Sequence, residues 1–342
     1  MLDSVVIGAG QAGLSASYHL ARRGIAHVVL DANPRPGGAW QHRWDTLTMH
    51  DVHGVADLPG AERPPADDAQ RANEVVPAYF ADYETAFALP VQRPVAVRTV
   101  TDDDGVLVVS AEDRHWRTRT LVNATGTWSR PFVPHYPGIE TFRGRQLHTA
   151  DFTRPEDFAG RRVLVVGGGA SAVQFLGELR PITDTLWVTR REPVWTDEEF
   201  TPEIGRQVVA KVEERVRQGL PPASVVSVTG LRLRPQERRA AELGAYERSA
   251  MFERIEPHGV RWHSGRFEEV DVILWATGFR PAVEHLAPLR LRSDRGGIAL
   301  DGTTAVVDRR IQLVGYGPSA STIGANRAGR SAALGVQAWL TR

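Results

Sequence analysis

The sequence contains no cysteine and has no excess of charge of either sign. The absence of cysteine excludes disulfides, thiolate nucleophiles and thiolate metal sites. Basic and acidic residues both number 41, so the formal net charge is zero and no overall field would attract nucleic acid or an anionic membrane. The 342 residues are 42% hydrophobic and 24% charged, which is typical of a globular protein long enough for two domains.

Long apolar segments are also missing. No run approaches the roughly 20 residues that a membrane helix needs, and no basic and apolar leader precedes the first strand-like segment. These absences predict a cytoplasmic protein with no membrane or nucleic-acid partner. His42, His50 and His53 lie close together in the sequence but lack the spacing of a helical metal-binding pair, so we expect no metal site.

The residues that are present form two glycine-rich loops. In the first, an apolar run at 5–7 precedes three glycines, and a helical stretch then leads to a second apolar run that ends at Asp31. This is the βαβ plan of a dinucleotide site, in which the glycines allow a tight turn, the approach of a pyrophosphate, and close packing of helix and strand. The three glycines are Gly8, Gly10 and Gly13.

The second loop repeats the plan. An apolar run at 163–166 is followed by small residues, a helical stretch and a second apolar run that ends at Thr189. Alanine replaces the third glycine, which the fingerprint allows. The loop residues that we assign to a nucleotide are Gly167, Gly169, Ser171 and Ala172.

The two loops differ in charge at the end of their second strand. Asp31 lies 18 positions after Gly13, and Arg190 lies 18 positions after Ala172. A carboxylate there accepts hydrogen bonds from ribose hydroxyls and repels a 2′-phosphate, whereas a guanidinium, with Arg191 beside it, suits that phosphate. The first loop is therefore predicted to bind an unphosphorylated adenosine ribose and the second NADPH. The alternative for the two arginines is a solvated basic pair.

Two dinucleotide sites in one chain need different ligands if hydride is to pass between them, and FAD with NADPH is the natural pair. The segment "RPGGAW", residues 35–40, brings a second glycine pair just beyond Asp31, where backbone can approach FAD. Trp40 is either a residue that flanks the flavin ring or a core tryptophan. The further residues assigned to FAD here are Arg35, Gly38 and Gln41.

An apolar strand that stops on Ala-Thr-Gly follows each loop. The two segments are "LVNATGTWSRP", residues 121–131, and "VILWATGFRP", residues 272–281. We interpret them as crossovers where backbone returns toward a nucleotide and glycine allows close approach, the alternative being an ordinary strand and turn. This assigns Thr125 and Gly126 to FAD, and Thr277 and Gly278 to NADPH.

The rest of the chain gives an α/β organisation with two dinucleotide-binding, doubly wound domains. Residues 96–122 alternate apolar and polar positions and predict antiparallel strands, with the acidic residues 102–104 in a turn. Residues 203–219 predict an amphipathic helix. Prolines at 131–137 and Pro155 mark entry to the second domain, and the strand at 311–317 follows the return.

Between the loops, "FRGRQLHTADF" is similar to the identifying motif of flavin-containing monooxygenases. With both loops, "GGAW" and "WATGFRP", the resemblance covers most of the chain, and the small bacterial members match its length. It implies an FAD domain of residues 1–150 and 272–342 and an inserted NADPH domain of residues 155–271. The motif positions are Phe142, Gly144, His148 and Phe152.

The resemblance also implies a reaction. NADPH reduces the flavin, which reacts with O2 to give a C4a-hydroperoxide; bound NADP+ shields it while one oxygen passes to a soft nucleophile, a sulfide or amine, on a small molecule. NADH is expected to be a weaker donor. The identity of the substrate and the formation of a homodimer are left open.

Particular residues take roles by the same resemblance. His50 aligns where many members place an asparagine near the flavin. The final strand, at Gly315, lacks the acid that related flavoproteins use on the ribityl chain, and amides near Ser321 would replace it. Gly144 is expected to turn the chain while His148 and Phe152 hold the domains together over the NADP site; a purely structural histidine is the alternative.

Other functions share parts of this pattern. A disulfide reductase is excluded because it requires a cysteine pair. A Baeyer–Villiger monooxygenase is disfavoured because its motif ends in Trp before Pro or Asp, whereas this one ends Phe152-Thr153. An NADPH oxidase that releases hydrogen peroxide stays open. A non-enzymatic redox sensor is disfavoured, since it would need only one of the two loops.

Overall fold

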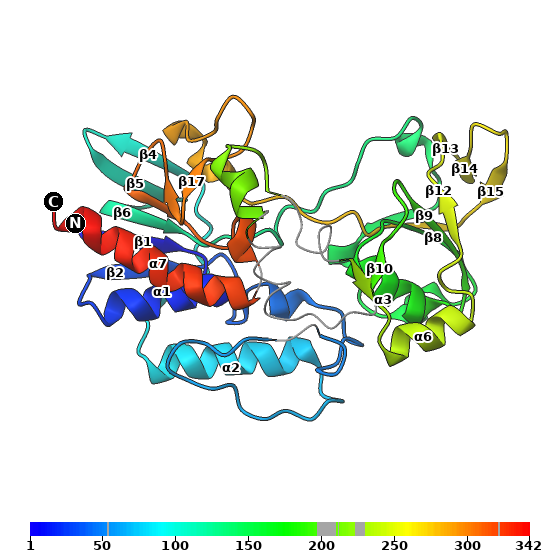
Figure 1. Ribbon diagram of the computed structural model, residues 1–342, viewed down its shortest axis with the longest axis horizontal. Helices are drawn as coiled ribbons and strands as arrows, with labels where there is room; N and C mark the ends of the chain where they lie inside the picture. Colours follow the sequence, from blue (N-terminus) through cyan, green and yellow to red (C-terminus); the bar gives the residue numbers. More distant parts are fainter. Residues whose placement is uncertain (53–54, 197–209, 211, 223–229, 321) are drawn as a thin grey trace. The chain divides into compact units, whose positions relative to one another are not determined.

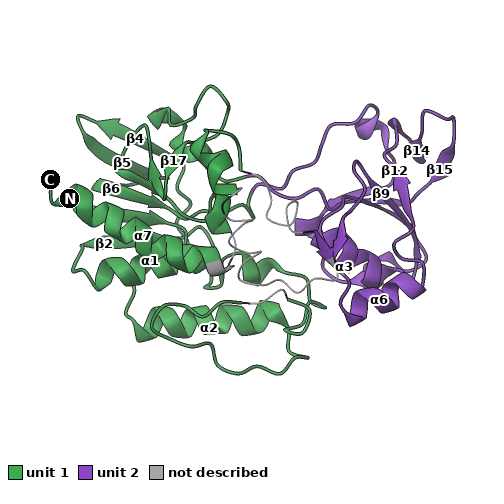
Figure 2. Cartoon of the chain, in the orientation of Figure 1, with its two compact units in different colours: residues 1–129, 205–225, 281–342 green, residues 130–204, 226–280 purple. Residues whose placement is uncertain are grey.

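A computed structural model describes residues 1–52, 55–196, 210, 212–222, 230–320 and 322–342. The chain forms two compact units, each built around a parallel sheet (Figures 1 and 2). Unit 1 comprises Met1–Ser129, Gly205–Val225 and Pro281–Arg342, and unit 2 comprises Arg130–Ile204 and Val226–Arg280. The predicted α/β class with two dinucleotide-binding domains is confirmed.

Nine described strands form the sheet of unit 1. Its main order is β17-β18-β19-β6-β1-β2-β3, and the central strands β19, β6, β1, β2 and β3 are parallel. The strands are β1 (Leu2–Ile7), β2 (His27–Leu30), β3 (Val91–Gln92), β4 (Thr99–Asp103), β5 (Val106–Ala111), β6 (Arg114–Asn123), β17 (Leu300–Asp301), β18 (Thr304–Ala305) and β19 (Ile311–Leu313).

The central strand of unit 1 is buried on both faces. Val6 packs into a core beneath the helices, whereas Val5 and Ile7 point to a second core on the side of the β4–β5 hairpin. Helices α1 and α7 run side by side over the first face (Figure 1). The helices are α1 (Gln11–Ala21), α2 (Ala72–Ala86) and α7 (Thr322–Leu340), with 3-10 turns η1 (Gly38–His42), η5 (Glu284–Leu289) and η6 (Gly317–Ala320).

The predicted antiparallel segment is confirmed, with one correction. Strands β4, β5 and β6 pair antiparallel over the expected residues. Asp102 and Asp103 belong to β4, and the turn is made by Asp104 and Gly105. Asp102 and Asp103 are in the strand because their backbone pairs with Leu107 and Val106 of β5. The Asp102 carboxylate also accepts hydrogen bonds from the Gly105 amide, at 2.8 Å, and from Arg310.

Unit 2 contains a five-stranded parallel sheet in the order β12-β9-β8-β16-β7. A three-stranded antiparallel sheet and a two-stranded pair accompany it. The strands are β7 (Arg145–His148), β8 (Arg162–Val166), β9 (Asp184–Thr189), β10 (Trp195–Thr196), β11 (Leu231–Arg232), β12 (Arg248–Ala250), β13 (Arg254–Glu256), β14 (Gly259–Arg261), β15 (Phe267–Glu269) and β16 (Val272–Trp275). The helices are α3 (Ala170–Leu179) and α6 (Pro235–Glu242), with turns η2 (Ile139–Thr141), η3 (Thr149–Asp151) and η4 (Pro155–Phe158).

The boundaries of the compact units differ from those of the predicted domains. The sequence placed the changes near residues 150 and 272, but β7 and β16 both belong to the sheet of unit 2, where β16 lies between β7 and β8. The units therefore change after Ser129 and after Arg280. The reason is strand pairing, which adds one parallel strand on each side of the expected insert.

The remaining predictions concern a helix at 203–219, membrane-spanning segments and metal ligands. The predicted helix at 203–219 is described at 210 and 212–217, where Val212 and Val216 are buried, and its remainder lies outside the described residues. Within the described ranges, no helix has the length and apolar character to cross a membrane. Nor do these ranges hold three metal-ligating side chains grouped together.

Candidate functional site

In both units a glycine of the loop lies directly against the backbone of the Ala-Thr-Gly segment, with no side chain between them. Gly8 has a φ of +101°, and a Cβ there would lie 2.6 Å from the carbonyl oxygen of Ala124. Gly167 has a φ of +141°, and its Cβ would lie 2.2 Å from the carbonyl oxygen of Ala276. A side chain at either glycine would push loop and strand apart. Loop and segment therefore pack closely in both units through the first glycine of each loop. The approach of Gly126 and Gly278 to a nucleotide stays a prediction.

The first Ala-Thr-Gly segment is held by residues that follow the second one. The Thr125 hydroxyl donates to the carbonyl oxygen of Ala282 at 2.5 Å, and the Ala282 amide donates to the carbonyl oxygen of Gly126 at 2.9 Å. All three residues lie in unit 1. A Cβ at Gly126 would meet nothing within 4 Å, so this glycine leaves open space rather than packing against the loop.

The second Ala-Thr-Gly segment is held in the same way by a residue that follows the first. The Thr277 hydroxyl donates to the carbonyl oxygen of Phe132, and the Phe132 amide donates to the carbonyl oxygen of Gly278 at 3.0 Å. The Arg280 amide also donates to the carbonyl oxygen of Arg130 at 2.8 Å. These bonds lie inside unit 2. The two crossovers are thus reciprocal, because each segment is bonded to residues that follow the other.

A buried polar chain supports the first crossover. Asn123, at the end of β6, donates from Nδ2 to the Thr125 hydroxyl at 3.0 Å and accepts a bond from His285 Nε2 at 2.6 Å. Burial lowers the pKa of His285 to about 4, which outweighs the opposing charge of Glu284. His285 is therefore a neutral donor near neutral pH. Neither Asn123 nor His285 carried a motif in the sequence.

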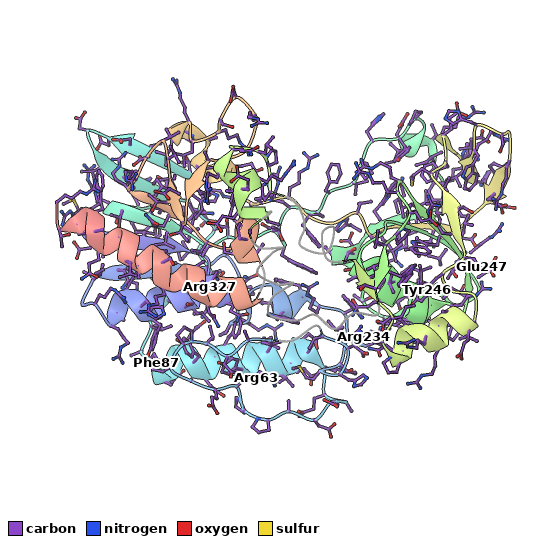
Figure 3. The ribbon with its side chains drawn as sticks, in the orientation of Figure 1. Arg63, Phe87, Arg234, Tyr246, Glu247 and Arg327 are labelled. Carbon is purple, nitrogen blue, oxygen red and sulfur yellow. The ribbon has the colours of Figure 1, made fainter. Side chains whose placement is uncertain are left out.

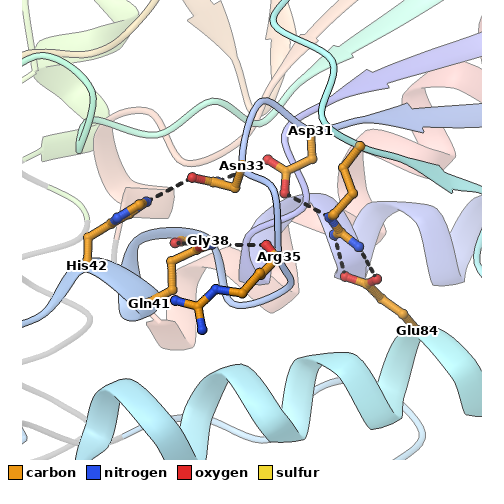
Figure 4. A network of polar contacts seen from close by, with 8 residues as sticks. Asp31, Asn33, Arg35, Gly38, Gln41, His42 and Glu84 are labelled. Carbon is orange, nitrogen blue, oxygen red and sulfur yellow. Dashed lines mark hydrogen bonds and ion pairs between the residues drawn. The ribbon is translucent and has the colours of Figure 1, made fainter.

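The acid at the end of β2 lies in a buried ionic group (Figure 4). Asp31 has 4% of its side chain exposed and lies 3.4 Å from Nε of Arg93. Arg93 also bonds Glu84 of α2 through both terminal nitrogens, at 2.6 and 2.7 Å. Two carboxylates and one guanidinium leave the group with net negative charge. That charge favours ribose hydroxyls over a 2′-phosphate. No sequence motif indicated Arg93 or Glu84.

The segment after Asp31 is held by amide side chains (Figure 4). Asn33 donates to Asp31 Oδ1 at 3.1 Å and accepts a bond from His42 Nε2 at 2.8 Å. Gln41 donates to the carbonyl oxygens of Arg35 and Gly38, at 3.0 and 3.2 Å. These bonds fix the turn that carries the second glycine pair.

The guanidinium of Arg43, in this segment, has a buried nitrogen without a hydrogen-bond partner among the described residues. Arg43 lies over the rings of Trp40 and Trp128, at 5.5 and 4.6 Å from their centroids, and its Nε is buried without a partner. Burial lowers the pKa of Arg43 to about 10, so it stays charged at neutral pH. A buried cation between two indole rings is a group that an anionic ligand would complete. The sequence singled out Trp40 but not Arg43 or Trp128.

The second loop is anchored from the neighbouring strand. The Trp187 indole of β9 donates to the carbonyl oxygen of Gly167 at 2.7 Å, while Ala172 is buried in α3 and Ser171 is half-buried. A Cβ at Gly169 would meet nothing within 4 Å, which leaves the approach to this backbone open. Arg190 and Arg191 are exposed after β9, and neither side chain bonds another described residue.

Known proteins match this chain over most of its length. The family model of the pyridine nucleotide-disulphide oxidoreductases covers residues 5–305. The flavin-containing monooxygenase from Stenotrophomonas maltophilia, a solved structure, is 36% identical over 99% of this chain and 99% of its own, with a TM-score of 0.86. The chain belongs to the flavin-containing monooxygenase family. As a member it is a flavin monooxygenase, and hence an oxidoreductase.

Two more distant relatives add to this comparison. The uncharacterized oxidoreductase CzcO of Bacillus velezensis is 28% identical over 207 residues, which are 57% of this chain and 60% of that protein. The OTEMO complex with FAD and NADP is 15% identical over 98% of this chain and 84% of that one, with a TM-score of 0.66, and shares the fold. The broader family is named for disulphide chemistry, but this monooxygenase has no thiol with which to perform it.

The residues of this monooxygenase fit a flavin nucleotide in unit 1 and a nicotinamide nucleotide in unit 2. In unit 1, a Cβ at Gly38 would lie 2.8 Å from Cα of Gly10, so two stretches of bare backbone face each other. That arrangement suits a pyrophosphate. In unit 2, the open backbone at Gly169 follows β8, and Arg190 comes directly after the next strand, β9.

The family motif is packed inside unit 2. A Cβ at Gly144 would lie 2.3 Å from the carbonyl oxygen of Asp271 and 2.5 Å from Cζ of Phe142, so the glycine permits β7 to reach β16. His148 Nε2 donates to the carbonyl oxygen of Gly278 at 2.9 Å, and Nδ1 accepts from the Ala150 amide at 3.2 Å. Both nitrogens are engaged, and burial lowers the pKa of His148.

Phe152 completes the motif by stacking on Phe158 and Phe175, at centroid distances of 5.3 and 4.3 Å. Together with His148 it joins β7, α3 and the second Ala-Thr-Gly segment within one unit. A role in holding the domains together stays a prediction.

Two residues that the resemblance singled out lie elsewhere in unit 1. His50 is exposed, and its Nδ1 lies 3.7 Å from the Asp68 carboxylate at the surface. Gly315 lies beside the first crossover, where its Cβ would be 3.5 Å from Cα of Gly126. Ser321 lies outside the described residues. The roles of His50 and Gly315 stay predictions.

Proposed function

We propose that this monooxygenase binds FAD in unit 1 and NADPH in unit 2 and oxygenates a sulfide or amine of a small molecule. The observation that carries the cofactor assignment is the opposite charge at equivalent strand ends. Asp31 lies in a net negative buried group after β2, whereas Arg190 and Arg191 follow β9 with no bond to another described side chain. The two loops are therefore selective for different riboses.

The overall reaction consumes NADPH, O2, a proton and the substrate, and releases NADP+, water and the oxygenated product. Bound FAD would supply the redox chemistry by taking two electrons from NADPH and delivering them to O2. The described residues bind and orient. Gly10 and Gly38 offer backbone to the pyrophosphate, Asp31 accepts bonds from the ribose hydroxyls, and the reciprocal crossovers hold Thr125 and Thr277 beside their loops.

The function is tested with the purified holoprotein and 18O2. We expect one 18O atom in a sulfoxide or N-oxide product, with NADPH consumed in equal amount and little hydrogen peroxide. NADPH oxidation that yields only hydrogen peroxide across a panel of sulfides and amines would identify an oxidase instead. A protein that stays colourless after FAD is supplied would overturn the flavin assignment.

The cofactor assignment is tested separately with Arg190→Ala. Because a charge-assisted bond to the 2′-phosphate is lost, we expect the KM for NADPH to rise about tenfold or more while the KM for NADH changes little. Steady-state kinetics with both donors provide the measurement. Equal changes for NADPH and NADH would contradict the assignment of Arg190.

A further inference from the structure

A third arginine reaches the end of β9 from a distant part of the sequence. Arg248 begins β12, which pairs in parallel with β9 at the edge of the sheet, with Arg248 opposite Trp187. Its side chain runs toward the carboxyl end of β9, where Nε donates to the Thr189 hydroxyl at 2.6 Å and Nη2 to the Thr189 carbonyl oxygen at 3.4 Å. Arg248 lies 58 positions after Arg190, outside every loop and motif.

Thr189 connects this arginine to the arginine pair. Its side chain is buried, and its hydroxyl accepts the bond from Arg248 and donates to the carbonyl oxygen of Arg191 at 2.7 Å. A hydroxyl can accept and donate at once, so the three residues form one directed chain. The chain fixes the backbone turn from which Arg190 and Arg191 project.

The charge of Arg248 is not neutralised within the described part of the chain. Elsewhere in unit 2, half-buried arginines have carboxylate partners: Arg234, labelled in Figure 3, lies 2.5 Å from Glu237, and Arg261 lies 2.5 Å from Glu256. Arg248 bonds only the hydroxyl and carbonyl oxygens of Thr189 among the described residues, and its Nη1 makes no bond there. A half-buried guanidinium with unused donors is suited to an external anion.

We propose that Arg248 is a specificity-determining residue for NADPH, which holds the Arg190–Arg191 turn through Thr189 and presents its remaining N–H groups to the 2′-phosphate. The proposal rests on the assignment of NADPH to unit 2. It adds to that assignment the residue that orders an otherwise exposed arginine pair. Preorganised donors bind an anion more tightly than donors that must be ordered on binding.

Binding of 2′,5′-ADP and 5′-AMP to the holoprotein tests the proposal, since the two probes differ only in the 2′-phosphate. In Arg248→Gln we expect the Kd for 2′,5′-ADP to rise about ten- to a hundredfold and that for 5′-AMP to change less than about twofold. Arg248→Lys keeps the positive charge but loses the forked donors of the guanidinium. Its Kd for 2′,5′-ADP should therefore lie between those of the unaltered protein and Arg248→Gln. The control Arg254→Gln removes an arginine of β13 that is paired with Glu256, and should leave both Kd values unchanged.

The possible outcomes distinguish a failure of this proposal from a failure of the NADPH assignment on which it rests. If the unaltered protein binds both probes equally, the assignment of NADPH fails. If it discriminates, and Arg190→Ala loses discrimination while Arg248→Gln and Arg248→Lys keep it, only the role of Arg248 is overturned. A fall in affinity for both probes alike, or a fall in Tm without a change in the Kd ratio, would assign Arg248 a structural role and overturn the proposal.

Discussion

At the scale of single residues, the family motif is explained by lack of space. Gly144 has no room for a methyl group, because the backbone of Asp271 and the ring of Phe142 lie on either side of it. His148 is likewise fully used, with one nitrogen donating and the other accepting. Among the described residues, the motif positions therefore contribute to packing and hydrogen bonding within unit 2.

Gly144→Ala is expected to lower the free energy of unfolding by about 2 kcal/mol, since the new methyl would overlap fixed backbone. Denaturant titration measures the change. The matched control is Gly169→Ala, where a Cβ meets nothing within 4 Å and little loss is expected. Equal stability of the two variants would show that β7 can shift to make room.

The lowered pKa of His285 predicts that this residue contributes to the pH dependence of stability. Its pKa is about 4 in the folded protein against 6.5 for an ordinary histidine, so between these values the unfolded chain binds the extra proton. Stability present above pH 6.5 should therefore fall by about 3 kcal/mol as the pH drops toward 4. In His285→Gln, which keeps an amide donor for Asn123, denaturant titrations across this range should show a shallower loss. An unchanged slope would contradict this prediction.

At the scale of elements, helix α2 is joined to strand β2 by charge. Glu84, near the end of α2, and Asp31, after β2, share Arg93, and all three side chains are at most 13% exposed. The ion pairs therefore set the position of Asp31, which we propose binds the ribose, as well as that of the helix.

Arg93→Met would leave two buried carboxylates without a counter-charge. We expect a loss of about 3 kcal/mol in stability and weaker FAD binding. Fluorescence titration of the apoprotein with FAD and denaturant titration measure the two effects. The control Glu84→Gln keeps the pair of Asp31 and Arg93 and should be milder. If it proves as harmful as Arg93→Met, the shared arginine is not what orients Asp31.

At the scale of the whole molecule, each of the two proposed nucleotide sites draws its loop and crossover from one unit. The bonds of the first loop and crossover lie in unit 1, and those of the second lie in unit 2. Loss of one nucleotide should therefore leave the other site able to bind.

Gly10→Ala tests this independence. The methyl group would lie 4.0 Å from Cα of Gly38, so the fold has room for it, but it would fill the space that the pyrophosphate approaches. We expect a colourless protein that still binds 2′,5′-ADP, measured by calorimetry. Arg190→Ala provides the opposite control, yellow and defective in 2′,5′-ADP binding. Loss of both ligands in Gly10→Ala would show that the sites depend on each other.

The parts of this organisation that could be predicted from the sequence are those written in adjacent residues. Residues 2–31 and 162–190 are continuous βαβ units whose spacing fixes the strand ends. Arg93, Arg43 and Arg248 could not be found in this way, since their roles depend on partners or neighbours brought together by folding. The compact units differ from the predicted domains for the same reason, because nothing local to β7 or β16 indicates which sheet they join.

The reciprocal crossovers also bear on the exchange of parts between related enzymes. Phe132 can hold Gly278, and Ala282 can hold Gly126, only if both connecting segments come from compatible parents. A chimaera cut near residues 150 and 272 would take β7 and β16 from one parent and β8 from the other. Cuts after Ser129 and Arg280, with residues 205–225 kept from the recipient, leave both sheets and both sets of crossover bonds whole. Unit 2, the proposed nicotinamide unit, is thus a replaceable module whose borders lie in the crossovers.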